Sequence, residues 1–174
     1  MAVMDLVNVP NGTRVFVDTN IFFLHFTGKS AACTAFIQRV QAGDIPAFVN
    51  SRVMLDLLHK LMLVEAFQKG MIPQPRAEKL KVWLVGNRAN AGRLADYQTQ
   101  FDSILALGIE MLRTTKKLLA ETETERRVHA LMVGDSLHLG CMNRHEPAIS
   151  DPVTNDSDFD HVSSIRIWKP KDIA

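Results

Sequence analysis

Short β-forming runs alternate along this chain with longer segments of helical periodicity, and no other feature narrows the possible folds as much. Parallel strands need a crossover connection, usually a helix, whereas antiparallel strands can be joined by a tight turn. The pattern therefore predicts an α/β fold with a mostly parallel central sheet of four to five strands flanked by helices. The expected strands span residues 14–18, 47–50, 109–112, about 148–153, and 165–168 as a final edge strand.

Helices are predicted between these strands from apolar spacing and from capping residues. Ser51, for example, is a candidate N-cap for the helix that follows the second strand. No internal repeat or linker divides the sequence, which predicts one domain over residues 1–174 with a core from about 14 to 170. The expected helices span about 30–41, 51–68, 76–86, 94–107, 114–119 and 134–144.

Composition is compatible with a folded domain and excludes several classes. At 174 residues and 47% hydrophobic content, the chain can bury a core without disulfides, and disorder is not expected. Cys33 and Cys141 lack metal-binding spacing and are predicted to be buried free thiols, so a cytoplasmic protein is expected. Residues 1–9 do not resemble a signal peptide, and no apolar run approaches the length of a membrane span.

Four aspartates occupy positions where these elements begin or end. Asp18 directly follows the first strand and Asp156 follows the fourth, while Asp56 lies in the helix after strand two and Asp135 begins a late helix. Carboxylates at the carboxyl ends of parallel strands meet at the edge where open α/β folds place ligands. Converging carboxylates repel each other unless a cation lies between them, and hard oxygen ligands favour Mg²⁺ or Mn²⁺. At a helix start, the dipole is expected to favour the ionised form of Asp135.

Each aspartate also has an ordinary structural interpretation. An isolated aspartate after a strand is most often a helix N-cap, and Asp156 with Asp158 is compatible with an Asx turn that Asn155 could also make. Four acids in separate segments that meet at one end of one sheet favour the metal site instead. Asp158 either reaches this pocket as a further ligand or faces solvent.

The acids lie in short motifs: Val-Asp-Thr-Asn-Ile at 17–21, a serine-led helix carrying Asp56, Gly-Asp-Ser at 134–136, and Thr-Asn-Asp-Ser-Asp-Phe at 154–159. These motifs resemble those of a PIN domain, most closely the VapC-type toxin ribonucleases. The resemblance spans about residues 14–170 and keeps the family's motif order. It implies a single PIN-like, Rossmann-like domain. Two departures are visible: Asp56 stands where the family usually has glutamate, and Pro152 interrupts the fourth strand.

The resemblance implies a metal-dependent ribonuclease that is a toxin. Its catalytic and metal-binding residues would be Asp18, Asp56, Asp135 and Asp156, around one or two Mg²⁺ ions that activate a water for attack on phosphorus. Polar neighbours would orient the acids or hold metal-bound waters. The resemblance also implies an RNA substrate, a homodimer, and a small antitoxin whose C-terminal segment blocks the pocket. The orienting residues would be Asn20, Ser51 and Thr154.

The net charge of +1 hides a local excess of bases. Residues 59–93 contain seven bases against two acids, Glu65 and Glu78. A basic region beside an acidic pocket would suit a phosphodiester backbone, and an ordinary solvated helix face is the equal alternative. The seven bases are Lys60, Lys69, Arg76, Lys79, Lys81, Arg88 and Arg93.

Two other functions are compatible with the sequence. A PIN-like fold with an altered acidic set would be a catalytically weak or inactive module that binds RNA or protein. Residues 134–137 also read GDSL and residues 158–161 match DxxH, the two signatures of a serine esterase family, in which Ser136, His161 and Asp158 would form a triad. The two signatures are much closer together here than in that family. His59 and His138 are assigned no role.

Overall fold

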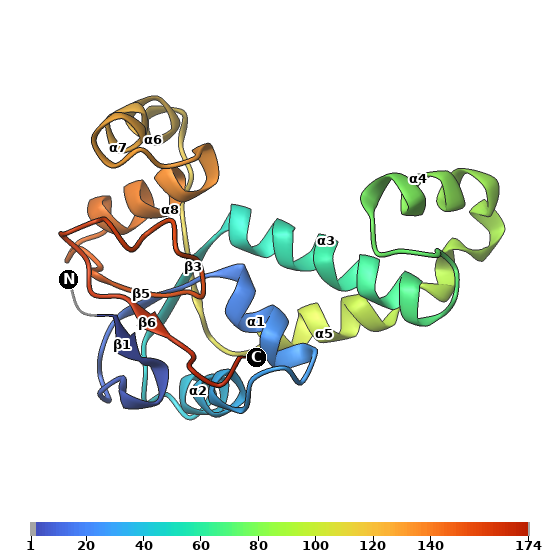
Figure 1. Ribbon diagram of the computed structural model, residues 1–174, viewed down its shortest axis with the longest axis horizontal. Helices are drawn as coiled ribbons and strands as arrows, with labels where there is room; N and C mark the ends of the chain where they lie inside the picture. The colour runs from blue at the N-terminus through green and yellow to red at the C-terminus, as the bar shows by residue number, and fades with distance from the viewer. Residues whose placement is uncertain (1–2, 174) are drawn as a thin grey trace.

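The computed structural model describes residues 3–173, and its centre is one six-stranded sheet in which every pair of neighbours is parallel (Figure 1). The strand order is β1-β6-β5-β2-β3-β4. The predicted α/β class is confirmed, with six strands in place of the four to five expected. The strands are β1 (Met4–Asp5), β2 (Val15–Val17), β3 (Ala47–Asn50), β4 (Glu110–Leu112), β5 (Asp151–Val153) and β6 (Trp168–Lys169).

The additional strand changes the edge of the sheet. β1 pairs with β6 through Met4 with Trp168 and Asp5 with Lys169, so β6 lies between β1 and β5. The prediction that the last strand forms an edge is therefore wrong. β1 has only two residues, and so short a strand leaves no period-two pattern in the sequence.

Eight α-helices and two short 3₁₀ helices connect the strands within residues 3–173. The predicted helices all form, whereas α1 and α7 are absent from the sequence prediction. Thr115 is the N-cap of α6, and its side chain accepts a hydrogen bond from the Leu118 N–H. The helices are η1 (Leu6–Asn8), α1 (Thr19–Phe26), α2 (Ala31–Gln41), α3 (Ser51–Gln68), α4 (Ala77–Gly86), η2 (Arg88–Arg93), α5 (Asp96–Leu105), α6 (Lys116–Glu121), α7 (Glu123–His129) and α8 (Val133–Arg144).

The helices cover both faces of the sheet. In Figure 1, α1 and α2 lie below it, and α8 lies above it with α6 and α7 packed on its outer side. The main core between these layers is apolar, and Phe16, Phe22, Phe36 and Trp168 are among its largest fully buried side chains.

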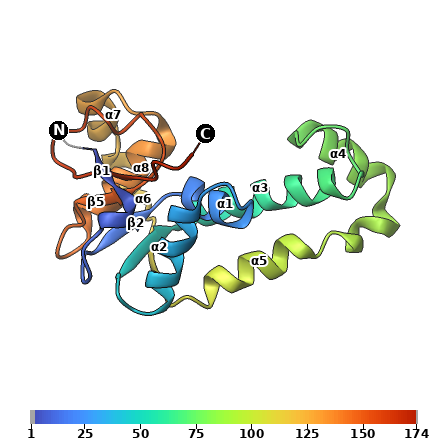
Figure 2. The same cartoon turned by 60° about the horizontal axis from the view of Figure 1, so that its bottom comes forward.

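A helical arm extends from the body. α3 begins beside the sheet and runs outward, α4 lies at the far end, and α5 returns alongside α3 (Figure 2). The arm has a small core of its own, which includes Ala66, Ile72, Leu80 and Leu94. The basic segment 59–93 thus belongs mostly to this arm.

Strand β5 accommodates the proline that the sequence places in it. Pro152 is opposite Phe16, and β5 pairs with β2 along all three of its residues. On the other side, only Val153 is paired, with Trp168 of β6. Proline cannot donate to a ladder, and the strand is accordingly short and more extensively paired on the β2 side. Thr154 and Asp156 still follow directly after it.

Two further expectations concern the whole chain. Cys33 and Cys141 are both buried free thiols, as predicted. None of the helices within residues 3–173 has both the length and the apolar character needed to cross a bilayer.

Candidate active site

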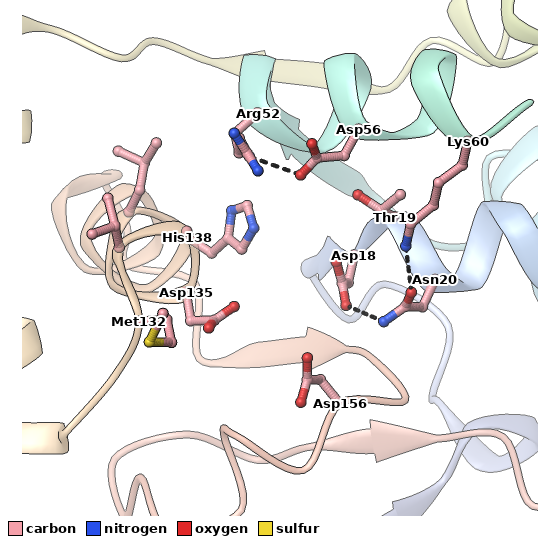
Figure 3. Close-up of a pocket in the computed structure, with 13 residues that line it drawn as sticks. Asp18, Thr19, Asn20, Arg52, Asp56, Lys60, Met132, Asp135, His138 and Asp156 are labelled. Atoms are coloured by element: carbon pink, nitrogen blue, oxygen red, sulfur yellow. Dashed lines mark hydrogen bonds and ion pairs between the residues drawn. The ribbon is translucent and has the colours of Figure 1, made fainter. Parts of the chain in front are cut away.

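The four aspartates selected from the sequence line one pocket at the carboxyl ends of the central strands (Figure 3). Its volume is about 570 Å³. Asp18 follows β2 and Asp156 follows β5, and the chain reaches β3 and β5 on opposite sides of β2. Open α/β sheets bind ligands at such a switch point. Asp56 enters the pocket from the second turn of α3, and Asp135 enters from the first turn of α8.

Asp18 is held by polar neighbours rather than used as a cap. It occupies the N-cap position of α1, yet its side chain makes no capping hydrogen bond. Thr154 Oγ1 and Asn20 Nδ2 both donate to Asp18 Oδ2, at 2.7 and 3.2 Å. Burial raises the pKa of Asp18, while the Thr154 hydrogen bond and the Lys60 charge lower it. Since both side-chain donors use Oδ2, Oδ1 is the oxygen that remains for a ligand.

Thr154 links two of the acids. Its hydroxyl donates to Asp18 and accepts the backbone N–H of Asp156 at 2.9 Å. Asp156 in turn accepts the backbone N–H of Asp158 on Oδ1 at 2.9 Å, so the Asx turn considered from the sequence does form. The turn uses one carboxylate oxygen only, and Asp156 still lines the pocket. Its turn and its place in the pocket are therefore compatible.

Asp158 is exposed and is not among the residues that line the pocket. Its charge nevertheless acts on Asp135, whose pKa is raised to about 6. Burial is the largest cause, followed by repulsion from Asp156, Asp158 and Asp18. The expectation that the helix dipole would favour ionised Asp135 is wrong in its outcome, because desolvation and neighbouring charges outweigh the dipole. Burial and three neighbouring carboxylates thus disfavour the ionised form of Asp135.

Cations border the pocket on the α3 side. Arg52 Nε donates to Asp56 Oδ2 at 2.7 Å, so the fourth acid is engaged by an exposed ion pair. Lys60, one turn beyond Asp56, donates from Nζ to Asn20 Oδ1 at 3.0 Å. Arg52, Asp56 and Lys60 succeed one another at four-residue intervals and so share one face of the helix.

Ser51 does not have the capping role predicted for it. The N-cap of α3 is Asn50, whose Oδ1 accepts the Val53 N–H at 3.1 Å. Ser51 is the first residue of the helix, is exposed, and does not line the pocket. Both residue types cap helices well, so the sequence favours neither of these adjacent positions.

His138 is a pocket residue that the sequence analysis left without a role. It lies one turn after Asp135 on α8, is 6% exposed, and lines the pocket. Its Nδ1 is 3.0 Å from Asn50 Nδ2, and burial lowers its pKa to about 4. Asn50 and His138 are 88 positions apart, so no local motif indicates the pair. His59 is exposed.

The esterase triad is not assembled. Ser136 is fully buried, and its hydroxyl donates to the Val133 carbonyl at 2.9 Å. His161 Nε2 bonds to the His129 carbonyl, and Asp158 is exposed on its turn. A nucleophilic serine must be accessible and hydrogen-bonded to its base, so these three residues do not form such a site.

The donor set fits Mg²⁺ in chemistry but is not a closed cage. Within residues 3–173, no three Asp, Glu, His or Cys side chains are grouped closely enough to hold one ion by themselves. Mg²⁺ keeps several waters and is commonly bound through one or two carboxylates together with substrate phosphates. The open pocket, with free oxygens on Asp18 and Asp156 and an uncompensated Asp135, suits that mode of binding.

Comparison with solved structures shows the fold. The chain is similar to VapBC2 from Rickettsia felis bound to a DNA fragment from their promoter, with a TM-score of 0.54 and 15% identity over 90% of this chain and 98% of that chain. FitAcB from Neisseria gonorrhoeae also matches, with a TM-score of 0.42 and 12% identity over 88% and 96% of the two chains. The sequence matches no family model and no curated protein. The chain therefore shares the fold of the VapBC2 structure, which is the kind of fold that the resemblance of its motifs implies.

Proposed function

We propose that this protein is a Mg²⁺- or Mn²⁺-dependent ribonuclease that hydrolyses phosphodiester bonds in RNA. The observation that carries the proposal is the convergence of Asp18, Asp135 and Asp156, from three separate segments, on one pocket at the switch point of the sheet. The VapC-like fold supports the same function. Uncompensated carboxylates destabilise a folded chain unless a cation joins them, so their retention needs a functional reason.

The chain's own residues would prepare the site. Asp18, Asp135 and Asp156 would share the ion with waters and substrate phosphate oxygens, and Asp56 would contribute once it leaves Arg52. Thr154 and Asn20 both donate to Asp18 Oδ2 and so leave Oδ1 available for the ion. When bound, Mg²⁺ supplies positive charge to the phosphoryl oxygens and lowers the pKa of a water. A nucleophilic side chain is not required for this hydrolysis.

An RNA substrate suits the charges around the pocket. Arg52 and Lys60 both line it, and either cation can contact the phosphates beside the scissile bond. Further bases lie on the arm at Arg76, Lys79 and Lys81, which are exposed. Lys69 does not belong to this set, because it forms ion pairs with Glu65 and Asp96.

The biological role we propose is that of a VapC-like toxin in a toxin–antitoxin pair. The protein would act in the cytoplasm as a homodimer, and a small antitoxin would occupy the acidic pocket through a C-terminal segment. The support is the fold shared with the VapBC2 structure, together with the open pocket. Co-expression with a short adjacent reading frame, followed by co-purification, tests the partnership.

The direct test is cleavage of a mixed RNA pool by the purified full chain with Mg²⁺ or Mn²⁺, and then with EDTA. We expect cleavage that requires the metal and falls by at least about 100-fold in Asp18→Asn, because several kcal/mol of transition-state stabilisation depend on the ion. Asp44→Asn is the matched control, since Asp44 is exposed and lies outside the pocket. Cleavage that survives Asp18→Asn would contradict the assignment.

The ion pair between Arg52 and Asp56 favours a second candidate, a PIN-like module that binds RNA or protein with weak or no catalysis. In this arrangement one of the four acids is neutralised by a base, and the acid is one methylene shorter than the family's usual glutamate. Tight RNA binding without metal-dependent cleavage would favour the module. Measuring both properties on the same preparation separates the two functions.

A further inference from the structure

The side chain of Asn50 fixes which nitrogen of His138 carries the proton. Asn50 Oδ1 accepts the Val53 N–H as the N-cap of α3, so the amide cannot rotate without losing this cap. Its Nδ2 therefore faces His138 Nδ1 at 3.0 Å and also contacts Cys141 Sγ at 3.5 Å. An amide nitrogen donates, so Nδ1 of the histidine must accept. In the neutral ring, the proton is then on Nε2.

The opposite edge of the ring opens onto the pocket. The imidazole packs against Phe16, with ring centroids 5.3 Å apart, and projects between Arg52 and Asp135 (Figure 3). Within residues 3–173, no hydrogen-bond partner faces Nε2. In that part of the chain, Thr114 Oγ1 is the one side-chain N or O atom that is both fully buried and without a hydrogen-bond partner. Nε2 has no partner either, so it is not fully buried, and His138 lines the pocket, from which Nε2 can be reached. A nearly buried side chain thus presents a free donor to the acidic site.

We infer that His138 is a further substrate-binding residue, whose neutral Nε2–H donates a hydrogen bond to a non-bridging oxygen of the RNA phosphate. The inference rests on the proposed ribonuclease function. Protonation of Nδ1 would place two donors against each other at 3.0 Å, and burial also disfavours the charged ring, so His138 is a donor without a net charge. A fixed neutral imidazole can stabilise charge that develops on a phosphoryl oxygen.

Two variants separate this role from simple packing. His138→Asn keeps an oxygen near the position of Nδ1 to accept from Asn50, but it is too short to donate into the pocket. His138→Gln extends an amide toward the position of Nε2 and gives up the acceptor for Asn50. We expect His138→Asn to lower kcat/KM on RNA by about 10- to 100-fold while folding normally, because the lost hydrogen bond is to a charged oxygen. His138→Gln should retain more activity despite lower thermal stability.

Two further measurements identify the partner of Nε2 and its tautomer. Mg²⁺ affinity without RNA should be the same in the wild type and His138→Asn, since the contact is with substrate. ¹⁵N NMR of the full chain should show neutral His138 protonated on Nε2 between about pH 6 and 8. Asn50→Asp keeps a capping oxygen for Val53 but replaces the donor with an acceptor, so it should move the proton to Nδ1 and lower kcat/KM as His138→Asn does.

The outcomes distinguish this inference from the proposed function. Wild-type cleavage with unchanged kcat/KM in His138→Asn would overturn the inference and leave the ribonuclease standing. Weaker Mg²⁺ binding in His138→Asn would also overturn it, because the histidine would then position an acid. If the wild type does not cleave RNA, the proposed function fails. The affinity for an RNA oligonucleotide in Ca²⁺ then tests whether His138 contacts the phosphate. Equal affinity of the wild type and His138→Asn in that assay would contradict that contact.

Discussion

Two carboxylates lie near opposite ends of α3, Glu65 in its last turns and Asp135 of α8 in the pocket that its first turns border, and their surroundings differ. In the last turns of the helix, Glu65 is 4% exposed and accepts hydrogen bonds from the backbone of Ala95 and Tyr97 and from Lys69 Nζ. Although burial raises it, these hydrogen bonds hold the pKa of Glu65 below its ordinary value. In the pocket that the first turns of α3 border, burial and neighbouring aspartates raise the pKa of Asp135 of α8 to about 6.

The difference separates a carboxylate that stabilises the fold from one that is available to a ligand. Glu65 joins α3 to the start of α5, and both of its oxygens have donors from the chain. Asp135 is half-buried among like charges, and no donor of comparable strength compensates it. A buried acid whose oxygens are all satisfied contributes to stability, whereas unsatisfied acids that face one another lower it until a cation binds.

The largest change in stability should come from removing Glu65, the acid whose oxygens all have hydrogen-bond donors. Glu65→Ala removes the acceptor of two backbone N–H groups and the partner of Lys69, and we expect the free energy of unfolding to fall by about 2 kcal/mol. Urea denaturation monitored by circular dichroism measures this. Glu78→Ala, at an exposed position of α4, is the control and should change stability by less than about 0.5 kcal/mol. Equal effects of the two variants would remove the basis of the comparison.

In the pocket, by contrast, removing a carboxylate should raise the free energy of unfolding. Asp135→Asn removes a charge that burial and three neighbouring aspartates disfavour, so at pH 7 in EDTA the variant should be more stable than the wild type. Solvent screening of this half-exposed group limits the gain to about 1 kcal/mol. The same denaturation assay measures it. A destabilised Asp135→Asn would show that the carboxylate is a structural group after all.

The pH dependence of stability follows from the same shift. The pKa of Asp135 is about 6 in the folded state and 3.8 for an ordinary, unperturbed aspartate, so between these pH values the folded chain binds the additional proton. Stability from this group is therefore present at low pH and lost as pH rises through about 6. The advantage of Asp135→Asn over the wild type in EDTA should shrink as pH falls from 7 to 4.5. An advantage that does not change with pH would contradict the electrostatic explanation.

The smallest effect should follow the loss of an exposed ion pair. Arg52→Ala breaks the 2.7 Å contact with Asp56, and exposed pairs of this kind contribute less than about 1 kcal/mol. Stability should hardly change, whereas Mg²⁺ should bind more tightly because a competing base has left the pocket. Calorimetric titration of both proteins measures this difference. Weaker Mg²⁺ binding in Arg52→Ala would mean that the arginine positions Asp56 for the metal.

The sequence predicts the parts of this molecule that leave a local signal. The parallel sheet, the helices on either side and the meeting of four aspartates at one edge all follow from strand and helix patterns together with known topology. β1 does not, because two residues carry no period, and α1 is hidden because Asp18-Thr19-Asn20 is also compatible with a turn. The N-cap of α3 was misplaced by one residue because Asn50 and Ser51 are equally good candidates.

The properties of the site depend on contacts across the fold, and the sequence predicts them only in part. The raised pKa of Asp135 depends on Asp156, Asp158 and Asp18, whose distances no sequence pattern fixes. Burial keeps His138 neutral, and its tautomer depends on Asn50, which belongs to another element. Helix position alone predicts a lowered pKa for Asp135, the opposite of the shift in the folded chain. Long-range packing therefore decides which of the motif residues have ordinary pKa values and contacts and which do not.

The most direct test of the central claim, that these carboxylates are uncompensated because they receive a cation, is calorimetric titration of Mn²⁺ into the metal-free full chain. Asp18→Asn and Asp44→Asn are titrated in parallel. We predict binding to the wild type and to Asp44→Asn, with affinity at least about tenfold lower in Asp18→Asn because one charged ligand is lost. Equal affinity in all three proteins, or no binding to the wild type, would contradict the claim.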